Sequence, residues 1–275
     1  MKKTILPLAL LCTVLTLSIL SCKKDSSNPP APTMVKEWTV ALSPKYENPA
    51  RAGRTETGTA SIKLMSDNKI NFTINVTGLA AGDALTAAHI HAGNVITNGG
   101  VVLGFDPVFS GSTATGNIKA IRTSFVDSLK NNVNELYFNV HSTLLPGGLL
   151  RGQLNVAIEM AEDIEMTGVN ETSPVSTTAT GLAILRLTAD KKLYSKVTIA
   201  NLEAGDALTV SHIHKAAAGA NGSPFITLCE NAADFGVAKM FVLTDLVFTS
   251  VNTDQVYVNA HSTNHGSGLV RGQIR

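Results

Sequence analysis

The sequence contains the same series of three short motifs twice, in the same order and at nearly the same spacing. Each series begins with His-x-His, continues with Asn-x-His-Ser-Thr and ends with Arg-Gly-Gln. The first series occupies residues 89–91, 139–143 and 151–153, and the second occupies 212–214, 259–263 and 271–273. The offset is 123 residues at the first motif (212 − 89) and 120 at the middle one (261 − 141). This pattern indicates a tandem duplication with small insertions and deletions.

The duplication predicts two domains. Residues 82–91 and 205–214 are identical at eight of ten positions. Each copy has more than 100 residues, which is enough for a hydrophobic core of its own. Acidic residues interrupt the apolar pattern between Ala157 and Asp163, where the two copies meet. We therefore expect domain 1 at residues 37–157 and domain 2 at residues 158–275.

The beginning of the chain resembles an export signal. Lys2 and Lys3 precede an apolar run from Ile5 to Leu20, which is too short for an ordinary membrane span. The run ends in Ile19-Leu20-Ser21-Cys22, which resembles the lipobox of bacterial lipoproteins. The resemblance implies a signal peptide over residues 1–21. The alternative is a plain secretory signal with an incidental cysteine.

In a lipoprotein the lipobox cysteine is acylated and becomes the first residue of the mature chain, so we expect a lipid anchor at Cys22. Residues 22–36 are polar and rich in Pro and Ser, which is typical of a flexible tether. The anchor implies a bacterial envelope protein held on a membrane without spanning it. The residue after Cys22 is Lys23 and not an aspartate, which favours the outer membrane over the inner one. The leaflet that the protein faces remains open.

Charge and cysteine content exclude two classes of protein. Removal of residues 1–21 takes away two lysines and no acids, so the mature chain has 20 basic (22 − 2) and 21 acidic residues. It carries no basic stripe, which argues against a nucleic-acid partner. Cys12 leaves with the signal and Cys22 is assigned to the lipid, so Cys229 remains without a disulfide partner. We expect Cys229 to be a small buried residue.

The spacing of apolar residues is that of β-strands. Ile70, Phe72, Ile74 and Val76 alternate with polar residues, and the second copy shows a similar run from Leu193 to Ile199. Polar segments 66–69 and 189–192, just before these runs, predict hairpin turns. Ile121, Phe125 and Leu129, spaced four apart, are the one helical pattern. We predict an all-β protein with two tandem antiparallel, Greek-key-like sandwich or barrel domains.

The same alternation brings the histidines of each copy together. If Ile90 points into the core, His89 and His91 share the opposite face, about 7 Å apart. Asn139 and His141 likewise lie opposite the apolar side chains of their own strand. The imidazoles therefore converge on an outer surface if the two strands are neighbours.

Two interpretations of this cluster remain open. Three imidazoles at such spacing suit copper or zinc, and the absence of thiolates argues against a Cys-rich structural zinc site. The alternative is a buried hydrogen-bonded network of Asn139, His141, Arg151 and Gln153 that ties loops to strands, with His89 and His91 as partly exposed members. Glu47 and Glu171 would join such a network. The candidate metal ligands are His89, His91, His141, His212, His214 and His261; the candidate binding residues add Asn139, Arg151, Asn259 and Arg271.

Taken together, the repeated motifs resemble the CHRD domain, a repeat of chordin that also occurs in bacterial secreted proteins. The resemblance rests on His-Ile-His, a Gly-rich segment, Tyr-x-Asn-x-His-Ser-Thr and Gly-Leu-x-Arg-Gly-Gln, and it covers both copies. It implies a compact β domain whose ligand it does not identify. Leu149 and Leu269 stand where the family usually has an acidic residue.

A weaker similarity is to Cu/Zn superoxide dismutase, which holds copper partly through a His-x-His strand and a later histidine, with an arginine near the end. The order His89, His91, His141, Arg151 matches, and Arg151 would then steer anions or donate hydrogen bonds. No bridging histidine, zinc loop or disulfide can be matched, so a copper site here would be mononuclear.

No nucleophile–base pair, phosphate loop or pair of carboxylates at fixed spacing is recognisable. We therefore expect a lipid-anchored binding or structural protein of the cell envelope rather than an enzyme. The rival class is a copper-binding or superoxide-handling redox protein with a three-histidine site in each domain.

Overall fold

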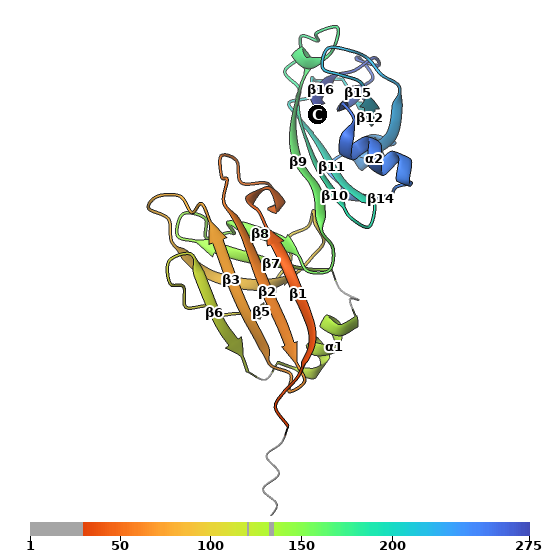
Figure 1. Ribbon diagram of the computed structural model, residues 1–275. Helices are drawn as coiled ribbons and strands as arrows, with labels where there is room; N and C mark the ends of the chain where they lie inside the picture. Colours follow the sequence, from red (N-terminus) through yellow and green to blue (C-terminus); the bar gives the residue numbers. More distant parts are fainter. Residues whose placement is uncertain (1–29, 120, 132–134) are drawn as a thin grey trace, which may run out of the picture. The chain divides into compact units, whose positions relative to one another are not determined.

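The computed structural model describes residues 30–119, 121–131 and 135–275 (Figure 1). The expected signal peptide and Cys22 lie outside the described residues. Within these residues no helix combines the length and the apolar character that a membrane span requires.

The described part of domain 1 is built from two four-stranded antiparallel sheets. The strand orders are β1(Met34–Leu42)-β2(Thr57–Met65)-β3(Ile70–Thr77)-β6(Thr113–Ile118) and β5(Val101–Gly104)-β4(Leu85–Ala92)-β7(Leu136–Ser142)-β8(Leu150–Gln153). The 3₁₀ helix η1 (Pro44–Tyr46) follows β1, and helix α1 (Thr123–Asn131) lies between β6 and β7. Because the chain changes sheets after β3, β5 and β6, the connections are of the Greek-key type.

Domain 2 repeats this topology as one eight-stranded antiparallel sheet. Its order is β13(Pro224–Cys229)-β12(Leu208–Lys215)-β15(Val256–Ser262)-β16(Val270–Gln273)-β9(Ile158–Thr167)-β10(Thr180–Thr188)-β11(Lys192–Ala200)-β14(Lys239–Val242). The 3₁₀ helices η2 (Gly168–Asn170) and η3 (Ala232–Asp234) and helix α2 (Asp245–Thr253) lie between strands. The two four-stranded halves of this sheet join where Arg271 of β16 pairs with Thr167 of β9. In domain 1 an isolated bridge between Ser43 and Arg151 occupies the equivalent place between the two sheets. The predicted all-β fold class is confirmed.

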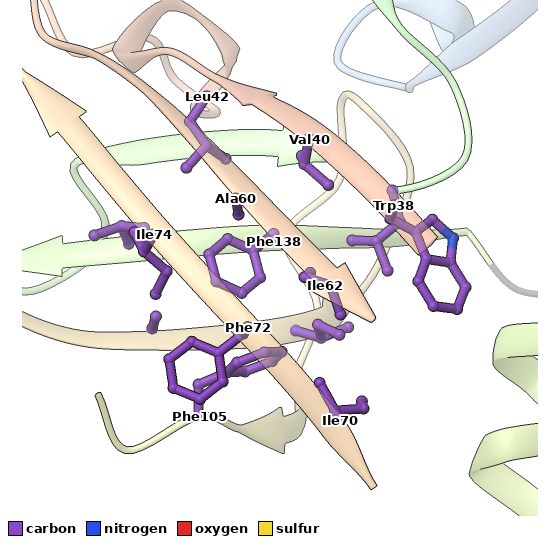
Figure 2. Close-up of a cluster of buried hydrophobic side chains, with 14 of the residues drawn as sticks. Trp38, Val40, Leu42, Ala60, Ile62, Ile70, Phe72, Ile74, Phe105 and Phe138 are labelled. Carbon is purple, nitrogen blue, oxygen red and sulfur yellow. The ribbon is translucent and has the colours of Figure 1, made fainter. Parts of the chain in front are cut away.

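The core of domain 1 lies between its two sheets. Figure 2 shows side chains of β1, β2 and β3 pointing toward Phe138 of β7. Phe105 contacts both Phe72 and Phe138 edge to face, with ring centroids 5.1 and 5.0 Å apart. Edge-to-face contacts of this kind add to the free energy gained by burying the rings. The predicted alternation of β3 is confirmed, since Ile70, Phe72, Ile74 and Val76 are all buried.

The predicted hairpin turns are present, and each contains a residue with positive φ. Asn68 has φ 60° and Lys191 has φ 62°, and both precede the strand that returns along the sheet. Cys229 is buried at the end of β13, as expected, and burial raises the pKa of its thiol to about 12. The thiol is therefore protonated and unreactive at neutral pH.

The structure contains α1, which the spacing of apolar residues predicted, and also α2, which we did not predict. α2 has β-branched residues at four of its nine positions, a composition of low helix propensity. Thr244 caps its first turn by accepting a hydrogen bond from the Val247 amide, at 3.4 Å. Tertiary packing completes the helix, because Val251 is fully buried in the domain 2 core.

Candidate metal centre

Strand pairing brings the three histidines of domain 1 together. β4 and β7 are adjacent and antiparallel, with Ala87 opposite His141 and His91 opposite Tyr137. Ile90 is fully buried in the core, so the imidazoles of His89 and His91 lie on the other face of β4. One ring nitrogen from each of the three histidines lies within 4.8 Å of the other two. We call this cluster site 1.

Domain 2 contains the same arrangement, which we call site 2. β12 pairs with β15, and ring nitrogens of His212, His214 and His261 again lie within 4.8 Å of one another. These two clusters are the groups of three potential ligands found among the described residues. The convergence satisfies the geometric requirement for a shared ion, and the role of these residues as ligands stays a prediction.

Backbone carbonyls determine which nitrogen of two site 1 rings faces the cluster. His91 Nδ1 lies 3.0 Å from the Gly99 carbonyl oxygen, and His141 Nδ1 lies 2.9 Å from that of Pro146. A carbonyl can only accept, so each Nδ1 carries the proton and each Nε2 carries the lone pair. His91 Nε2 is buried and has no hydrogen-bond partner in the described part of the chain. Such carbonyl contacts are the usual way in which a protein orients a metal-binding histidine.

Site 2 uses the equivalent backbone groups. His214 Nδ1 lies 2.8 Å from the Gly222 carbonyl oxygen, and His261 Nδ1 lies 3.1 Å from that of Gly266. His214 Nε2 and His212 Nδ1 are buried atoms without partners among the described residues. Both sites therefore present one Nδ1, from the first histidine of His-x-His, and two Nε2 atoms.

The remaining nitrogen contacts differ between the sites. In site 1, His89 Nδ1 lies 3.0 Å from the unprotonated His141 Nε2, so the His89 Nδ1–H donates a hydrogen bond to His141 in the metal-free protein. In site 2, His261 Nε2 lies instead 3.2 Å from the side-chain oxygen of Asn259. The imidazoles of site 2 are correspondingly farther apart, with 5.4 Å between the centroids of His212 and His261 against 4.9 Å between those of His89 and His141.

A tyrosine and an arginine support the second histidine of each pair. In domain 1 the ring of Tyr137 is stacked on His91, and the Arg151 guanidinium carbon lies 3.6 Å from the centre of the same ring. Because β7 lies between β4 and β8, His91 and Arg151 approach Tyr137 from neighbouring strands on its two sides. Tyr257 and Arg271 make the same contacts in domain 2, where the cation lies 3.4 Å from the ring centre.

Arg151 is fully buried and donates hydrogen bonds, which is one of the two roles that the sequence suggested for it. Its guanidinium donates to the side chain of Asn98 at 2.9 Å and to the carbonyls of Thr97, at 2.9 Å, and Asn94. Arg271 similarly donates to the carbonyls of Ala217 and Ala220. Both arginines therefore hold the loop that follows the His-x-His strand.

The expected polar network is also present. It surrounds the histidine cluster, so the cluster and the network exist side by side. The Asn139 amide donates to Glu47 at 3.0 Å, and Gln153 donates to the Gly93 carbonyl at 2.8 Å. Burial raises the pKa of Glu47 to about 7, against the lowering effect of the Arg51 and Arg151 charges. Burial likewise raises the pKa of Glu171, which bonds to Asn259. Both glutamates join the network, as the sequence suggested.

The histidine face is less open than strand alternation alone implied. His214 is buried and the other five histidines are half-buried, because the loops held by Arg151 and Arg271 fold over them. Desolvation lowers the pKa of five of the six, and neighbouring histidine or arginine charges lower it further; these five are His89, His91, His141, His212 and His261. Neutral imidazole is the form that binds metals, so protons compete weakly at neutral pH.

Sequence reasoning assigned no role to three features that shape the sites. Asp83 accepts hydrogen bonds from Ser142, Thr143 and the Leu144 amide, which orders the turn after His141. Asp206 accepts the equivalent bonds from Thr263 and Asn264. The second feature is the tyrosine that stacks on the second histidine of each pair, and the third is the loop glycine whose carbonyl orients that histidine. All of these residues stand inside the repeated segments, which was the available signal.

Comparison with known proteins identifies the repeat. The family model described as the CHRD domain matches residues 38–154 and residues 163–274, which together make up most of the chain. Searches of curated proteins and of solved structures found no match.

Proposed function

The chain belongs to the CHRD domain family, and we propose that each of its two domains binds one copper ion through three imidazoles. The observation that carries the proposal is the pair of buried nitrogens, His91 Nε2 and His214 Nε2, that have no partner among the described residues. A buried polar atom without a partner costs about 1–3 kcal/mol. Two equivalent atoms carry this cost, each facing two further imidazole nitrogens. A metal ion in the cluster would supply the missing interaction.

The ligand atoms favour copper over the other common metals. Three neutral nitrogens with no thiolate nearby suit copper or zinc, and carboxylate-preferring ions such as magnesium or calcium are poorly matched. Among divalent ions, a nitrogen site of unconstrained geometry binds Cu²⁺ more tightly than Zn²⁺. Three protein ligands also leave a coordination position for water or a small ligand.

The surrounding network supports this proposal as well as the stability of the fold. The carbonyls of Gly99 and Pro146 hold two rings with Nε2 toward the centre. The structural alternative explains why the loops are tied down, but it leaves the Nε2 atom of His91 unpaired. The metal proposal accounts for both observations.

We further propose that the protein carries these sites at the bacterial cell envelope, held by lipid on Cys22. Support comes from Ile19-Leu20-Ser21-Cys22 at the end of the apolar run and from the polar tether that follows. Stable anchoring needs two or more acyl chains, because one gives an affinity of only about 10⁴ M⁻¹. A flexible tether would leave both domains free to meet metal ions or an envelope ligand.

Metal content tests the copper proposal. The mature protein, loaded with Cu²⁺ and dialysed, should retain about two copper ions per chain by elemental analysis, from one three-ligand site per domain. His91→Ala and His214→Ala should each remove one ion and together remove both. His265→Ala is the matched control, because His265 belongs to neither cluster and should retain both ions.

Unfolding measurements on the same variants separate the two interpretations. Loss of copper with little change in the free energy of unfolding supports a metal site. A loss of about 1–3 kcal/mol with no effect on metal content supports the structural network and would remove the copper proposal. If the protein retains zinc but no copper, the three-histidine sites stand as metal sites and the proposed metal changes from copper to zinc.

Fractionation tests the anchor. Cys22→Ala should move the protein from the membrane to the soluble fraction, whereas Cys12→Ala, within the signal segment, should leave it on the membrane. Mass spectrometry of the N-terminal peptide should show Cys22 as the first residue and acylated. An unmodified Cys22 in a protein that still sediments with membranes would contradict the anchor.

A further inference from the structure

Domain 2 contains a small cavity beside its buried arginine. The cavity has a volume of about 210 Å³, and we call it the Arg271 cavity; its lining residues are Asn170, Ala218, Gly219, Arg271 and Gln273. Ala218 and Gly219 are the fourth and fifth residues after the His-x-His motif. Domain 1 has larger side chains at these two positions, Val95 and Ile96, and both are buried. The shorter side chains of domain 2 leave space in this part of the loop.

The Arg271 guanidinium lies at the wall of the cavity, and its hydrogen bonds leave part of it unused. Nη2 donates to the carbonyls of Ala217 and Ala220, at 3.2 and 2.9 Å, on either side of the two small residues. Nη1 lies 3.5 Å from the side-chain oxygen of Asn221, which is beyond the usual range of a hydrogen bond. That oxygen already accepts a hydrogen bond from the Thr172 hydroxyl at 3.0 Å. Arg271 therefore has N–H groups available for a further acceptor.

The charge of Arg271 is also poorly compensated. Arg186, which is fully buried as well, forms an ion pair with Asp163 at 2.7 Å. Among the described residues, Arg271 contacts only neutral oxygens and the Tyr257 ring. The charge of Glu171 acts on it from farther away, and burial raises the pKa of that carboxyl, which makes it a weak counter-charge. A buried cation without a counter-charge is costly, so an anion in the cavity would stabilise it.

Gln273 adds a second requirement for the ligand. Its Nε2 donates to the carbonyls of Ala216, Val256 and Arg275, at 3.1, 3.1 and 2.6 Å. Three acceptors around Nε2 fix the orientation of the amide group. Its Oε1 is buried and has no hydrogen-bond partner in the described part of the chain. A ligand that fits this residue must therefore offer a hydrogen as well as a negative charge.

We propose that the Arg271 cavity binds a small oxyanion that carries a hydroxyl hydrogen, such as hydrogen phosphate or a short hydroxycarboxylate. The charged oxygens bind the guanidinium, whose planar set of N–H groups matches phosphate and carboxylate geometry. The hydroxyl donates to Gln273 Oε1. The cavity is several times the ~30 Å³ that one water molecule occupies, which is enough for an anion of about five heavy atoms. None of the lining residues is a histidine of site 2, so this site does not depend on the copper proposal.

Calorimetric titration of the mature, metal-free protein at pH 7.5 tests the proposal with two matched pairs of anions. Sulfate has the shape of phosphate but no hydrogen at this pH, and acetate lacks the hydroxyl of glycolate. Phosphate, glycolate or both should bind at about one per chain. Each anion that binds should do so at least about tenfold more tightly than its matched partner, because only the hydroxyl satisfies the glutamine oxygen. Binding of phosphate alone identifies an inorganic ligand, and binding of glycolate alone identifies an organic acid.

Ala218→Leu places this binding in the cavity. The larger side chain should narrow the space and weaken binding at least tenfold. Ala217→Leu is the matched control, because Ala217 is an exposed neighbour that does not line the cavity, and it should bind like the parent. Both positions are exposed, so both variants should unfold like the parent protein.

Three results would overturn the proposal. The first is that none of the four anions binds, or that each binds as tightly as its matched partner. The second is equal binding by the Ala218→Leu protein and its parent. The third is binding that appears only after copper is loaded, which would place the anion on the metal. None of these results bears on whether the histidines bind copper, which the metal content of the histidine variants decides.

Discussion

The phenol ring of Tyr137 is stacked on the imidazole of His91, with centroids 4.9 Å apart and planes 11° apart. Tyr257 and His214 repeat this contact at 4.7 Å and 7°. Each tyrosine is also contacted by a fully or almost fully buried arginine that holds the covering loop. The second histidine of each pair is therefore held by its own strand, by the stacked ring and by a loop carbonyl. Such support restricts the ring to one orientation before any metal binds.

The loop carbonyl can be tested through its glycine. A Cβ on Gly99 would lie 1.7 Å from the Ala92 carbonyl oxygen, so Gly99→Ala must displace the loop. The displacement moves the carbonyl that orients His91, and copper affinity at site 1 should fall at least tenfold. The overpacking should also cost about 1–3 kcal/mol of stability. Copper titration of a protein that keeps only site 1, through His212→Ala with His214→Ala, measures the affinity. Urea unfolding measures the stability.

Gly100→Ala is the matched control for this substitution. A Cβ on Gly100 would have no atom within 4 Å, so the same added methyl group one residue later should change neither quantity appreciably. Equal copper affinity in the Gly99→Ala and Gly100→Ala proteins would show that the loop carbonyl has no part in orienting His91.

Burial of Glu47 predicts a pH dependence of stability. Its pKa is about 7 in the folded chain against an ordinary value of 4.5, so the folded state holds a proton between these values that the unfolded state has released. The free energy of unfolding should therefore fall as pH rises from about 4.5 to 7 and change little further above that window. Glu47→Gln should remove this contribution and be more stable than the parent at pH 8 by about 1–3 kcal/mol.

Urea unfolding of the two proteins at pH 4.5, 6 and 8 measures the difference. The Gln side chain can still accept the hydrogen bond from Asn139, so loss of that contact does not confuse the comparison. Glu203→Gln removes a carboxylate from an exposed position and serves as the control. A Glu47→Gln protein whose stability follows the parent curve across the whole range would refute the expected burial cost.

Sequence reasoning identified which residues share a face but not what covers that face. The alternation around Ile90 correctly placed His89 and His91 together, because strand geometry has a fixed period of two. The covering loops could not be predicted, since the groups that orient His91 and His141 are backbone carbonyls, which carry no signal in a side-chain pattern. The sequence offered a buried Arg151 as one of two alternatives and could not decide between them, for a related reason. An arginine enters a core when carbonyls surround it, and their positions depend on the finished fold.

Asp83 predicts a difference between the two domains. It accepts hydrogen bonds from Ser142 and the Leu144 amide and forms an ion pair with Arg54, at 2.5 Å. These donors hold the pKa of Asp83 well below its usual range despite desolvation, so its contribution to stability is present above about pH 4 and is lost as pH falls. Asp83→Asn should reduce the free energy of unfolding at pH 7 by about 1–3 kcal/mol.

The equivalent Asp206 bonds to hydroxyl and amide groups and forms no ion pair with an arginine among the described residues. Asp206→Asn should therefore have the smaller effect at pH 7. Unfolding midpoints of the two variants measured side by side provide the check. A larger loss for Asp206→Asn would show that the Arg54 ion pair does not strengthen the turn after His141.

Arg151 connects the stability of domain 1 to the geometry of site 1. Arg151→Lys keeps the charge but loses the planar group that binds several loop acceptors and stacks on Tyr137. Buried carbonyls would lose their donors, so the free energy of unfolding should fall by about 2–4 kcal/mol. Because the same loop carries the Gly99 carbonyl, copper affinity at site 1 should fall as well, while site 2 remains unchanged. Arg122→Lys, at an exposed position of the same domain, should alter neither property. A protein with Arg151→Lys that unfolds like its parent and binds copper equally well would show that the buried arginine holds neither the loop nor the histidine.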